Sequence, residues 1–256
     1  MLDAERRQQL VELVEERNSL TVIELSEHFS VSPATIRRDL SQLSQRGLIE
    51  RAHGGAAKRV RTAAHMPEPP LLKRSSLQND EKRRIGAAAA AHVIDGATII
   101  ISSGTTTAEM IPHLASRNSL TVITNALNIV LLLAQYPQIT VITLGGILRH
   151  SEMTTLGSLA ENALENLRAD QLFMGSRAIH SNYGFSAENL AESHSDQTLM
   201  SSARETIVVA DHTKFGKVAM VRVAPVDRIT RIITDSGVPP EDVQSLTDNG
   251  VTVEVV

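Results

Sequence analysis

Apolar residues near the N-terminus recur at the spacing of α-helices. They predict a first helix over residues 4–17, a second over residues 22–29 and a third that starts at Ser32. The apolar side of the first helix consists of Leu10, Val11, Leu13 and Val14. Thr21 and Glu24 have the spacing of a capping box at the start of the second helix. The buried face of the third helix is marked at i, i+4 and i+7 by Ile36, Leu40 and Leu43.

The start of the third helix combines a cap with outward-facing polar groups. Ser32 suits the N-cap, and Pro33 suits the first helical position because its missing N–H would be unpaired there. The residues on outward faces are Ala34, Thr35, Arg37 and Arg38. Small and hydroxyl residues followed by guanidinium groups suit entry into the DNA major groove. With the turn at residues 30–32 this is a helix-turn-helix, and a helical interaction domain without DNA is the alternative.

After the third helix the pattern changes to that of a short hairpin. Gly47 is placed as a C′ glycine, and strands are predicted over residues 48–52 and 56–58 around a turn at residues 53–55. This predicts a winged helix-turn-helix. The whole chain has a formal net charge of −4, yet seven basic and two acidic residues lie between positions 33 and 61, where phosphate contacts would be needed. The predicted DNA-binding residues are Ser32, Ala34, Thr35, Arg37, Arg38, Arg51, His53 and Lys58.

From residue 79 onward, predicted helices and strands alternate. Helices are predicted over residues 79–93, 106–114, 126–134, 159–167, 190–203 and 241–248. Strands are predicted over residues 97–101, 120–123, 139–144, 171–174, 206–210, 231–233 and 251–255. Such alternation favours a larger α/β domain with a mostly parallel sheet covered by helices. We therefore divide the chain into a DNA-binding domain (1–58), a proline-containing linker (59–78) and an effector-binding and oligomerisation domain (79–256).

Composition excludes several kinds of chemistry. The chain has no cysteine, which removes disulfides, thiol catalysis and cysteine-ligated metals and fits a reducing cytoplasm. The N-terminal residues do not form the apolar run of a signal peptide, and the apolar stretches are too short to span a bilayer. The nine histidines lack metal-ligand spacing. We expect a cytoplasmic protein with no metal, no cofactor and no membrane partner.

A turn rich in glycine and hydroxyl groups follows the strand predicted over residues 97–101. Free backbone N–H groups at such a turn suit an anion, above all a phosphate, although a βα turn with a threonine cap is the plain alternative. Polar groups at other strand ends converge on the same sheet edge. The effector-binding residues predicted there are Ser103, Gly104, Thr105, Thr106, Thr107, Thr124, Asn125, Gly145, Gly146, Arg149 and Lys214.

Several short motifs follow one another along nearly the whole chain. They are residues 32–40 (SPATIRRDL), 53–56 (HGGA), 81–82 (EK), 103–107 (SGTTT), 124–125 (TN), 144–146 (LGG) and 210–216 (ADHTKFG). In this order they resemble the DeoR family of bacterial repressors of sugar metabolism. The resemblance implies a repressor of a carbohydrate-utilisation operon that binds double-stranded operator DNA as a homodimer or homotetramer. It also implies an effector domain similar to ribose-5-phosphate isomerase, modulated by a phosphorylated sugar or sugar-acid metabolite.

The chain departs from the family pattern at several positions. Many members have an aspartate where Ser102 stands, a small or acidic residue where Arg177 stands, and a basic pair where Asp196 and Gln197 stand. The first two changes make the pocket region more basic. We therefore add Arg177 to the effector-binding residues and hypothesise an effector with a second anionic group. A local ion pair between Arg177 and Asp196 is an equally weighted alternative.

A sugar-phosphate isomerase or sugar-kinase relative is the competing function. An isomerase needs a carboxylate base aimed at the substrate carbon. Asp211 and Glu188 lie near the predicted pocket, but they do not form a pair at a strand end. A complete recognition helix has no purpose in a free enzyme, so we favour the repressor and expect no catalytic residues.

Overall fold

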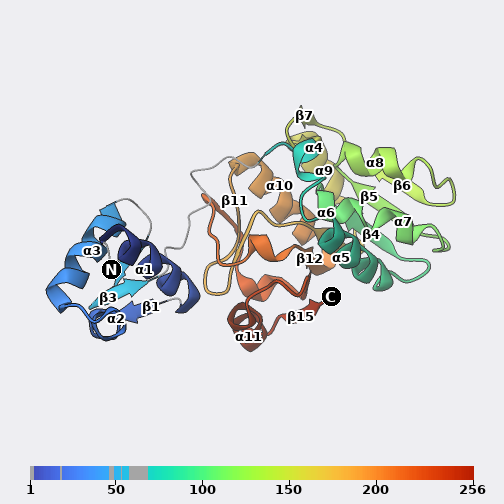
Figure 1. Ribbon diagram of the computed structural model, residues 1–256. Coiled ribbons are helices and arrows are strands. Elements are labelled where there is room, and N and C mark those ends of the chain that lie inside the picture. The colour runs from blue at the N-terminus through green and yellow to red at the C-terminus, as the bar shows by residue number, and fades with distance from the viewer. Residues whose placement is uncertain (1–2, 18, 46–48, 53, 58–68) are drawn as a thin grey trace. The chain divides into compact units, whose positions relative to one another are not determined.

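The computed structural model describes residues 3–17, 19–45, 49–52, 54–57 and 69–256 (Figure 1). The chain divides into two compact units, residues 1–61 and residues 62–256, which we call unit 1 and unit 2. Each is described by itself. Three residues named above lie outside the described residues, namely Gly47, His53 and Lys58.

Unit 1 is a helix-turn-helix with a three-stranded antiparallel sheet. Its elements are α1 (Asp3–Arg17), β1 (Ser19–Thr21), α2 (Val22–Phe29), α3 (Pro33–Gln45), β2 (Glu50–Ala52) and β3 (Gly55–Ala57). The sheet order is β1-β3-β2. The sequence predicts the β2–β3 hairpin but not β1, because three residues are too few to show alternation. The core contains the predicted apolar residues Leu10, Val14, Ile36, Leu40 and Leu43.

The helix starts in unit 1 have the predicted caps. Glu24 N–H donates to Thr21 Oγ1 at 3.2 Å, and Thr21 N–H donates to Glu24 Oε2 at 2.7 Å. This reciprocal pair is the capping box that the sequence predicts. Thr35 N–H donates to Ser32 Oγ at 3.3 Å, so Ser32 caps α3. The predicted boundaries at these two helix starts are confirmed.

A buried ion pair joins the first and third helices. Arg6 Nε donates to Asp39 Oδ2 at 2.8 Å, and the side chains of both residues are only 7% exposed. Arg7 Nε lies 3.7 Å from the other carboxylate oxygen of Asp39. Asp39 therefore faces the interior on the opposite side of α3 from the exposed Arg37 and Arg38.

The wing is held against β1 by two glycines. Gly54 has φ +85°, a conformation that glycine adopts without strain, and its carbonyl accepts a 2.8 Å hydrogen bond from Val22 N–H. A Cβ on Gly55 would lie 2.1 Å from the carbonyl oxygen of Leu20. The close approach of β3 to β1 therefore requires glycine at position 55.

Unit 2 contains a seven-stranded parallel sheet whose order is β15-β14-β12-β9-β4-β5-β6. The strands are β4 (Thr98–Ile101), β5 (Thr121–Thr124), β6 (Thr140–Thr143), β9 (Ala169–Met174), β12 (Ala203–Val209), β14 (Arg231–Thr234) and β15 (Thr252–Val255). All seven were predicted from the sequence, although boundaries differ by a few residues. The predicted fold class, a winged helix-turn-helix joined to a larger parallel α/β domain, is confirmed.

Two apolar layers cover the sheet, one on each face. One contains side chains of α5 (Asn79–Ala91), α7 (Ile111–Leu114) and α8 (Leu127–Leu133). The other contains side chains of α9 (Ser158–Glu165), α10 (Leu190–Ser201) and α11 (Pro240–Asp248). Neighbouring strand residues alternate between them, with Ile100 in the second layer and Ile99 and Ile101 in the first. Both faces are buried, which explains the apolar runs within these strands, such as residues 99–101 and 207–209.

Several elements of unit 2 were not predicted. They are α4 (Leu71–Arg74), the hairpin β7 (Ile147–Arg149) and β8 (Thr154–Leu156), and a second sheet of β10 (Ala178–His180), β11 (Gly184–Ala187) and β13 (Val221–Ala224). The helix predicted over residues 106–114 is interrupted, forming α6 (Thr105–Ala108) and α7. Pro112 contributes to the break because it has no N–H to continue the helical ladder.

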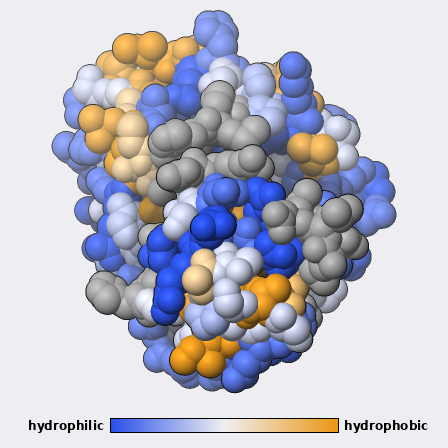
Figure 2. All heavy atoms as spheres, turned by 60° about the vertical axis from the view of Figure 1, so that its left-hand side comes forward, coloured by the Kyte–Doolittle hydropathy of each residue, from blue (hydrophilic) through white to orange (hydrophobic). Residues whose placement is uncertain are grey.

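In the face of the molecule shown in Figure 2, hydrophilic residues predominate and hydrophobic residues form separate patches. Among the described residues, no helix has the length and apolar character needed to cross a membrane. Large apolar residues on the surface of unit 2 include Leu131, Ile147 and Leu159. Scattered exposure of this kind is ordinary for a folded domain.

Candidate functional site

The outward face of α3 consists of small residues followed by arginines. Ser32, Ala34, Arg37 and Arg38 are exposed, and Thr35 is half-buried. Arg37 and Arg38 make no hydrogen bond or ion pair with any described residue, so both guanidinium groups are available to an external partner. Recognition helices contact base edges with residues near their N-terminus, which is where these exposed side chains of α3 lie.

The first strand of the wing is tied to the same helix. Arg51 is exposed, and one of its terminal nitrogens donates a 2.9 Å hydrogen bond to Ser41 Oγ on α3. The bond places a cation of the wing beside the helix that carries Arg37 and Arg38. The reading surface of unit 1 therefore contains guanidinium groups from both α3 and β2.

In unit 2, a cavity of about 470 Å³ lies at the carboxyl ends of four adjacent strands. The chain segments that leave β4, β5, β9 and β12 all contribute to its walls. Each strand ends where the chain turns away from the sheet, so this edge leaves room for a ligand. The cavity has the size typical of sites for small molecules.

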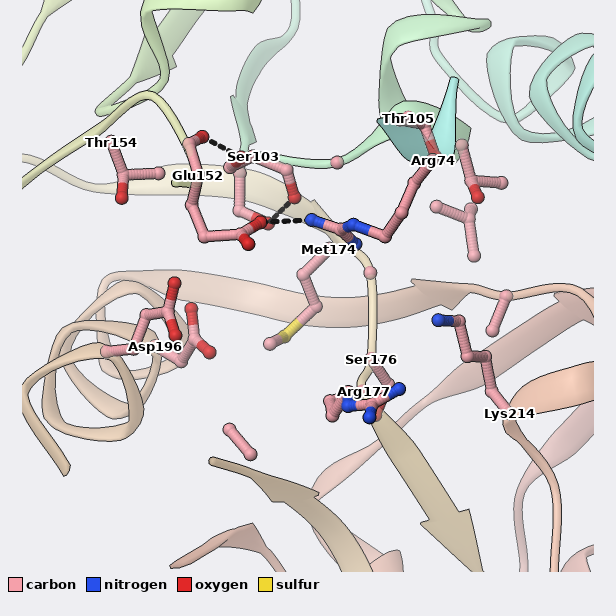
Figure 3. Close-up of a pocket in the computed structure, with 18 of the residues that line it drawn as sticks. Arg74, Ser103, Thr105, Glu152, Thr154, Met174, Ser176, Arg177, Asp196 and Lys214 are labelled. Carbon is pink, nitrogen blue, oxygen red and sulfur yellow. Dashed lines mark hydrogen bonds and ion pairs between the residues drawn. The ribbon is translucent and has the colours of Figure 1, made fainter. Parts of the chain in front are cut away.

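Ten ionisable residues line the cavity (Figure 3). The cations are Arg74, Lys82, Arg149, Arg177 and Lys214, and the acids are Glu152, Glu188, Glu192, Asp196 and Asp211. Three of the arginines form ion pairs with three of the glutamates. The ion pairs are Arg74 with Glu152, Arg149 with Glu192 at 3.3 Å, and Arg177 with Glu188 at 2.8 Å. Arg149 Nε is within ion-pair distance of Glu192, but its N–H makes no hydrogen bond to a described residue.

Two lysines and one aspartate lie together at one end of the cavity. The buried Lys82 Nζ donates to the carbonyls of Arg74, at 2.7 Å, and Leu77. Burial lowers the pKa of Lys82, the Asp211 carboxylate raises it, and the Lys214 ammonium lowers it again. Because an ammonium has three N–H donors, Lys82 keeps one donor beyond its two carbonyl partners. The Asp211 carboxylate and the Lys214 ammonium are therefore both close enough to Lys82 to influence it.

The turn after β4 forms the adjoining wall. Ser103, Gly104, Thr105 and the largely buried Thr106 line the cavity. Ser103 Oγ donates to the Glu152 carbonyl at 2.8 Å, which ties the turn to the chain before β8. The wall therefore combines hydroxyl groups with a fixed backbone.

The structure brings most of the predicted effector residues together. Those lining the cavity are Ser103, Gly104, Thr105, Thr106, Asn125, Arg149, Arg177 and Lys214. Thr107, Thr124, Gly145 and Gly146 are not among the described residues that line it. Thr107 Oγ1 donates to the Gly104 carbonyl, and Thr124 Oγ1 donates to the Ile101 carbonyl at 2.6 Å. Both threonines therefore hold the turns that carry the wall.

The glycines that follow β6 lie outside the described lining of the cavity. A Cβ on Gly146 would lie 2.6 Å from the Leu156 carbonyl oxygen, so Gly146 lets the chain pass close to β8.

Arg177 is bound to Glu188 and not to Asp196, so the ion pair proposed as an alternative for Arg177 has a different partner. The charge of Arg177 is already balanced, which removes the observation that favoured a second anionic group on the effector.

Sequence reasoning missed Arg74, Lys82, Glu152 and Asp196 as cavity residues. Arg74 falls within the predicted linker, but α4 is attached to unit 2 by a 2.9 Å hydrogen bond from Leu71 N–H to the Ser151 carbonyl and by the Arg74–Glu152 pair. Lys82 belongs to the EK motif at residues 81–82, which indicates the family but not the position of the lysine. The available signal was the spacing that puts Lys82 on the same helical face as Ile85 and Ala89, because a buried lysine usually has a partner.

Two family models match the chain. Residues 6–61 match the DeoR-like helix-turn-helix domain, and residues 77–236 match the DeoR C terminal sensor domain. The glycerol-3-phosphate regulon repressor of Escherichia coli K12 is 31% identical over 258 residues, covering 100% of both chains. The HTH-type transcriptional repressor CsqR of the same strain is 34% identical, covering 94% of this chain and 90% of its own. Ribose 5-phosphate isomerase A from Methanocaldococcus jannaschii aligns with a TM-score of 0.40 at 20% identity, over 53% of this chain and 54% of that chain.

A winged helix-turn-helix with an exposed arginine face, followed by an α/β domain with a charged cavity, defines a DNA-binding regulator with a sensor domain. The two domain matches together cover most of the sequence. The chain belongs to the DeoR family of transcriptional regulators.

Proposed function

We propose that this protein represses a carbohydrate-utilisation operon and that a phosphorylated sugar or sugar-acid metabolite bound in the cavity of unit 2 modulates repression. Relatives named as repressors support the direction of regulation, and one of them is named for a glycerol-3-phosphate regulon. The exposed face of α3 supports operator binding. As the family resemblance implies, we expect the protein to act as a homodimer or homotetramer, which light scattering of the full chain would test.

The observation that carries the effector proposal is the pair of lysines beside the turn after β4. Once the three arginine–glutamate pairs are set aside, Lys82, Lys214 and Asp211 are the ionisable groups at this end. A phosphate monoester brings two negative charges at most and several acceptor oxygens, so it complements ammonium groups and hydroxyl donors. Ser103, Thr105 and Thr106 contribute hydroxyl groups to the lining of the same cavity. The remainder of the cavity accommodates the carbon skeleton of a sugar.

We propose that the cavity binds its ligand without chemical turnover. The two carboxylates that an isomerase would use are engaged in other contacts. Asp211 Oδ1 accepts from Thr213 N–H at 3.0 Å and from the Thr213 hydroxyl, and Glu188 is paired with Arg177. A turnover assay with pentose and hexose phosphates tests this, and any protein-dependent isomerisation would favour the enzyme alternative.

Substitution at Thr106 tests the phosphate position. Thr106→Asp places a carboxylate on the wall beside the lysines, where it repels a phosphate, whereas Thr106→Asn has the same size without the charge. Glycerol 3-phosphate and hexose 6-phosphates serve as probes. In the wild-type protein, a probe at 100 times its Kd stabilises the folded state by about 2.7 kcal/mol. We expect this gain and the release of operator DNA to be lost in the Asp variant and retained, in weaker form, in the Asn variant.

Operator binding without effector provides the control for folding. It should be the same in the wild-type protein and in both Thr106 variants, because unit 1 is unchanged. A normal probe response in the Asp variant would place the phosphate site elsewhere.

A further inference from the structure

The end of the cavity formed by α10 differs in charge from the lysine end. Asp196 and Glu192 line it from α10, and Asn125 and Thr154 line it from the segments after β5 and at the start of β8. Figure 3 shows Asp196 and Lys214 on opposite sides of the drawn cavity, with Thr154 on the Asp196 side. We call Asn125, Thr154, Glu192 and Asp196 the acceptor end.

Asp196 differs from the other acids of the cavity because it has no counter-charge. The neighbouring Glu192 is paired with Arg149, Glu188 with Arg177, and Glu152 with Arg74. Asp196 makes no hydrogen bond or ion pair with any described residue. Burial and the Glu192 carboxylate together raise the pKa of Asp196 to about 8. A carboxylate in this position is therefore costly until a positive group approaches it.

Two further polar atoms at this end lack partners. Asn125 and Thr154 are each 4% exposed, and neither Asn125 Oδ1 nor Thr154 Oγ1 has a hydrogen-bond partner among the described residues. The Asn125 amide nitrogen is held by the Thr155 carbonyl at 3.3 Å and Ser195 Oγ at 3.4 Å. Its oxygen, which can only accept, is thereby left for another donor. Buried polar atoms without partners are uncommon, and both of these side chains line the cavity, where a bound ligand or an ordered water can supply the missing donors.

We propose that the effector carries a protonated amine opposite its phosphate, as an amino sugar phosphate does, and that the amine binds at Asp196. The phosphate end rests on the proposed function, whereas the amine end rests on the acceptor end alone. An ammonium supplies three N–H donors and the positive charge that Asp196 lacks. A hydroxyl supplies one donor and no positive charge, so the raised pKa keeps Asp196 protonated and no charge-assisted hydrogen bond forms.

A two-by-two comparison of ligands separates the amine from the phosphate. The full-length protein is titrated by calorimetry with glucose, glucosamine, glucose 6-phosphate and glucosamine 6-phosphate, and with the galactose series. We expect the amine to lower Kd about tenfold within each phosphorylated pair, the range of one charge-assisted hydrogen bond. N-acetylglucosamine 6-phosphate, whose nitrogen is uncharged, should lose this gain without any change in the protein.

Asp196→Asn keeps the size of the side chain and removes its charge. We expect the preference for the amine to fall to within about twofold in this variant. Asp227→Asn, an exposed acid outside the cavity, should keep the full preference. The unfolding temperature and operator affinity verify that both variants are folded.

Equal affinity for the amine and hydroxyl members in the wild-type protein would overturn the proposal. Retention of the amine preference in Asp196→Asn would also overturn it. If phosphorylated and unphosphorylated sugars bind with the same Kd in both series, the proposed phosphate site at the lysine end is wrong. The comparison of amine with hydroxyl still tests Asp196 in that case. The two failures are therefore distinguishable.

Discussion

The two units present their functional groups in opposite ways. In unit 1, most of the reading surface comes from residues that are close in sequence on α3, with Arg51 added from β2, and its arginines are exposed. In unit 2, the cavity is assembled from segments that lie far apart in sequence, and most of its charged groups are paired with each other. A surface that binds a large polyanion needs charged groups that are accessible. A cavity for a small ligand encloses its charged groups, so most of them have to be paired with each other.

Two aspartates, one in each unit, differ in whether a cation is paired with them. Asp39 in unit 1 is buried and neutralised by Arg6, so its charge serves to hold α1 against α3. Asp196 in unit 2 is partly buried and lacks a cation. A buried carboxylate with its cation supports the fold, whereas one without a cation is a candidate for ligand binding. The predictions below test that difference, beginning with the largest expected effect.

Removing the charge of Asp39 should have the largest effect on stability. Asp39→Asn leaves the Arg6 guanidinium buried without its counter-charge, which costs about 3–5 kcal/mol of unfolding free energy. Urea unfolding followed by hydrogen exchange should show the loss in unit 1 and not in unit 2. Replacing both Arg6 and Asp39 by leucine should recover much of it, because neither buried member of this pair is left without the other. Unchanged stability of Asp39→Asn would contradict a structural role for the pair.

Removing either arginine of the reading face should act on DNA and not on stability. Arg37→Ala and Arg38→Ala should each weaken binding to an operator fragment selected with the wild-type protein, by about 1–3 kcal/mol for a lost arginine–guanine pair. Their unfolding temperatures should match the wild type because neither side chain has a described partner. Arg204→Ala, at an exposed arginine of unit 2, provides the control. Unaltered affinity in both α3 variants would remove the recognition-helix assignment.

The pH dependence of unit 2 tests the carboxylate that lacks a cation. The pKa of Asp196 is raised from 3.8 to about 8, so the folded protein binds its proton more tightly than the unfolded chain does. The resulting stabilisation is complete below about pH 4 and is lost as the pH rises toward 8. Among the groups that face this end, Glu192 and Glu188 are held by their arginines.

Asp196→Asn cannot lose a proton, so its unfolding temperature should decline less than that of the wild type between pH 4 and pH 8. Differential scanning calorimetry across this range measures the difference. Parallel curves for the two proteins would show that Asp196 titrates near its ordinary pKa.

Local signals in the sequence account for most of the fold. Caps at Thr21 and Ser32 and the helical spacing of Ile36 and Leu40 depend on neighbours within a turn or two. They therefore set the helix starts of unit 1. Continuous apolar runs similarly predict the seven parallel strands, and the resulting strand order brings the turns after four of them to one edge.

The partners of the charged residues were decided by tertiary structure. Arg74 and Glu152 are separated by 78 positions, and nothing in the local sequence indicates that they pair. The same is true of Lys82, which enters the cavity because α5 packs on the sheet, and of Asp196, whose lack of a cation is visible only when its neighbours are known. Helix and strand signals are short-range because they depend on backbone geometry. The environment of a charge depends on every segment that packs around it. The sequence by itself therefore determined where the cavity lies. The folded chain determined which of the charged groups in the cavity are paired with each other.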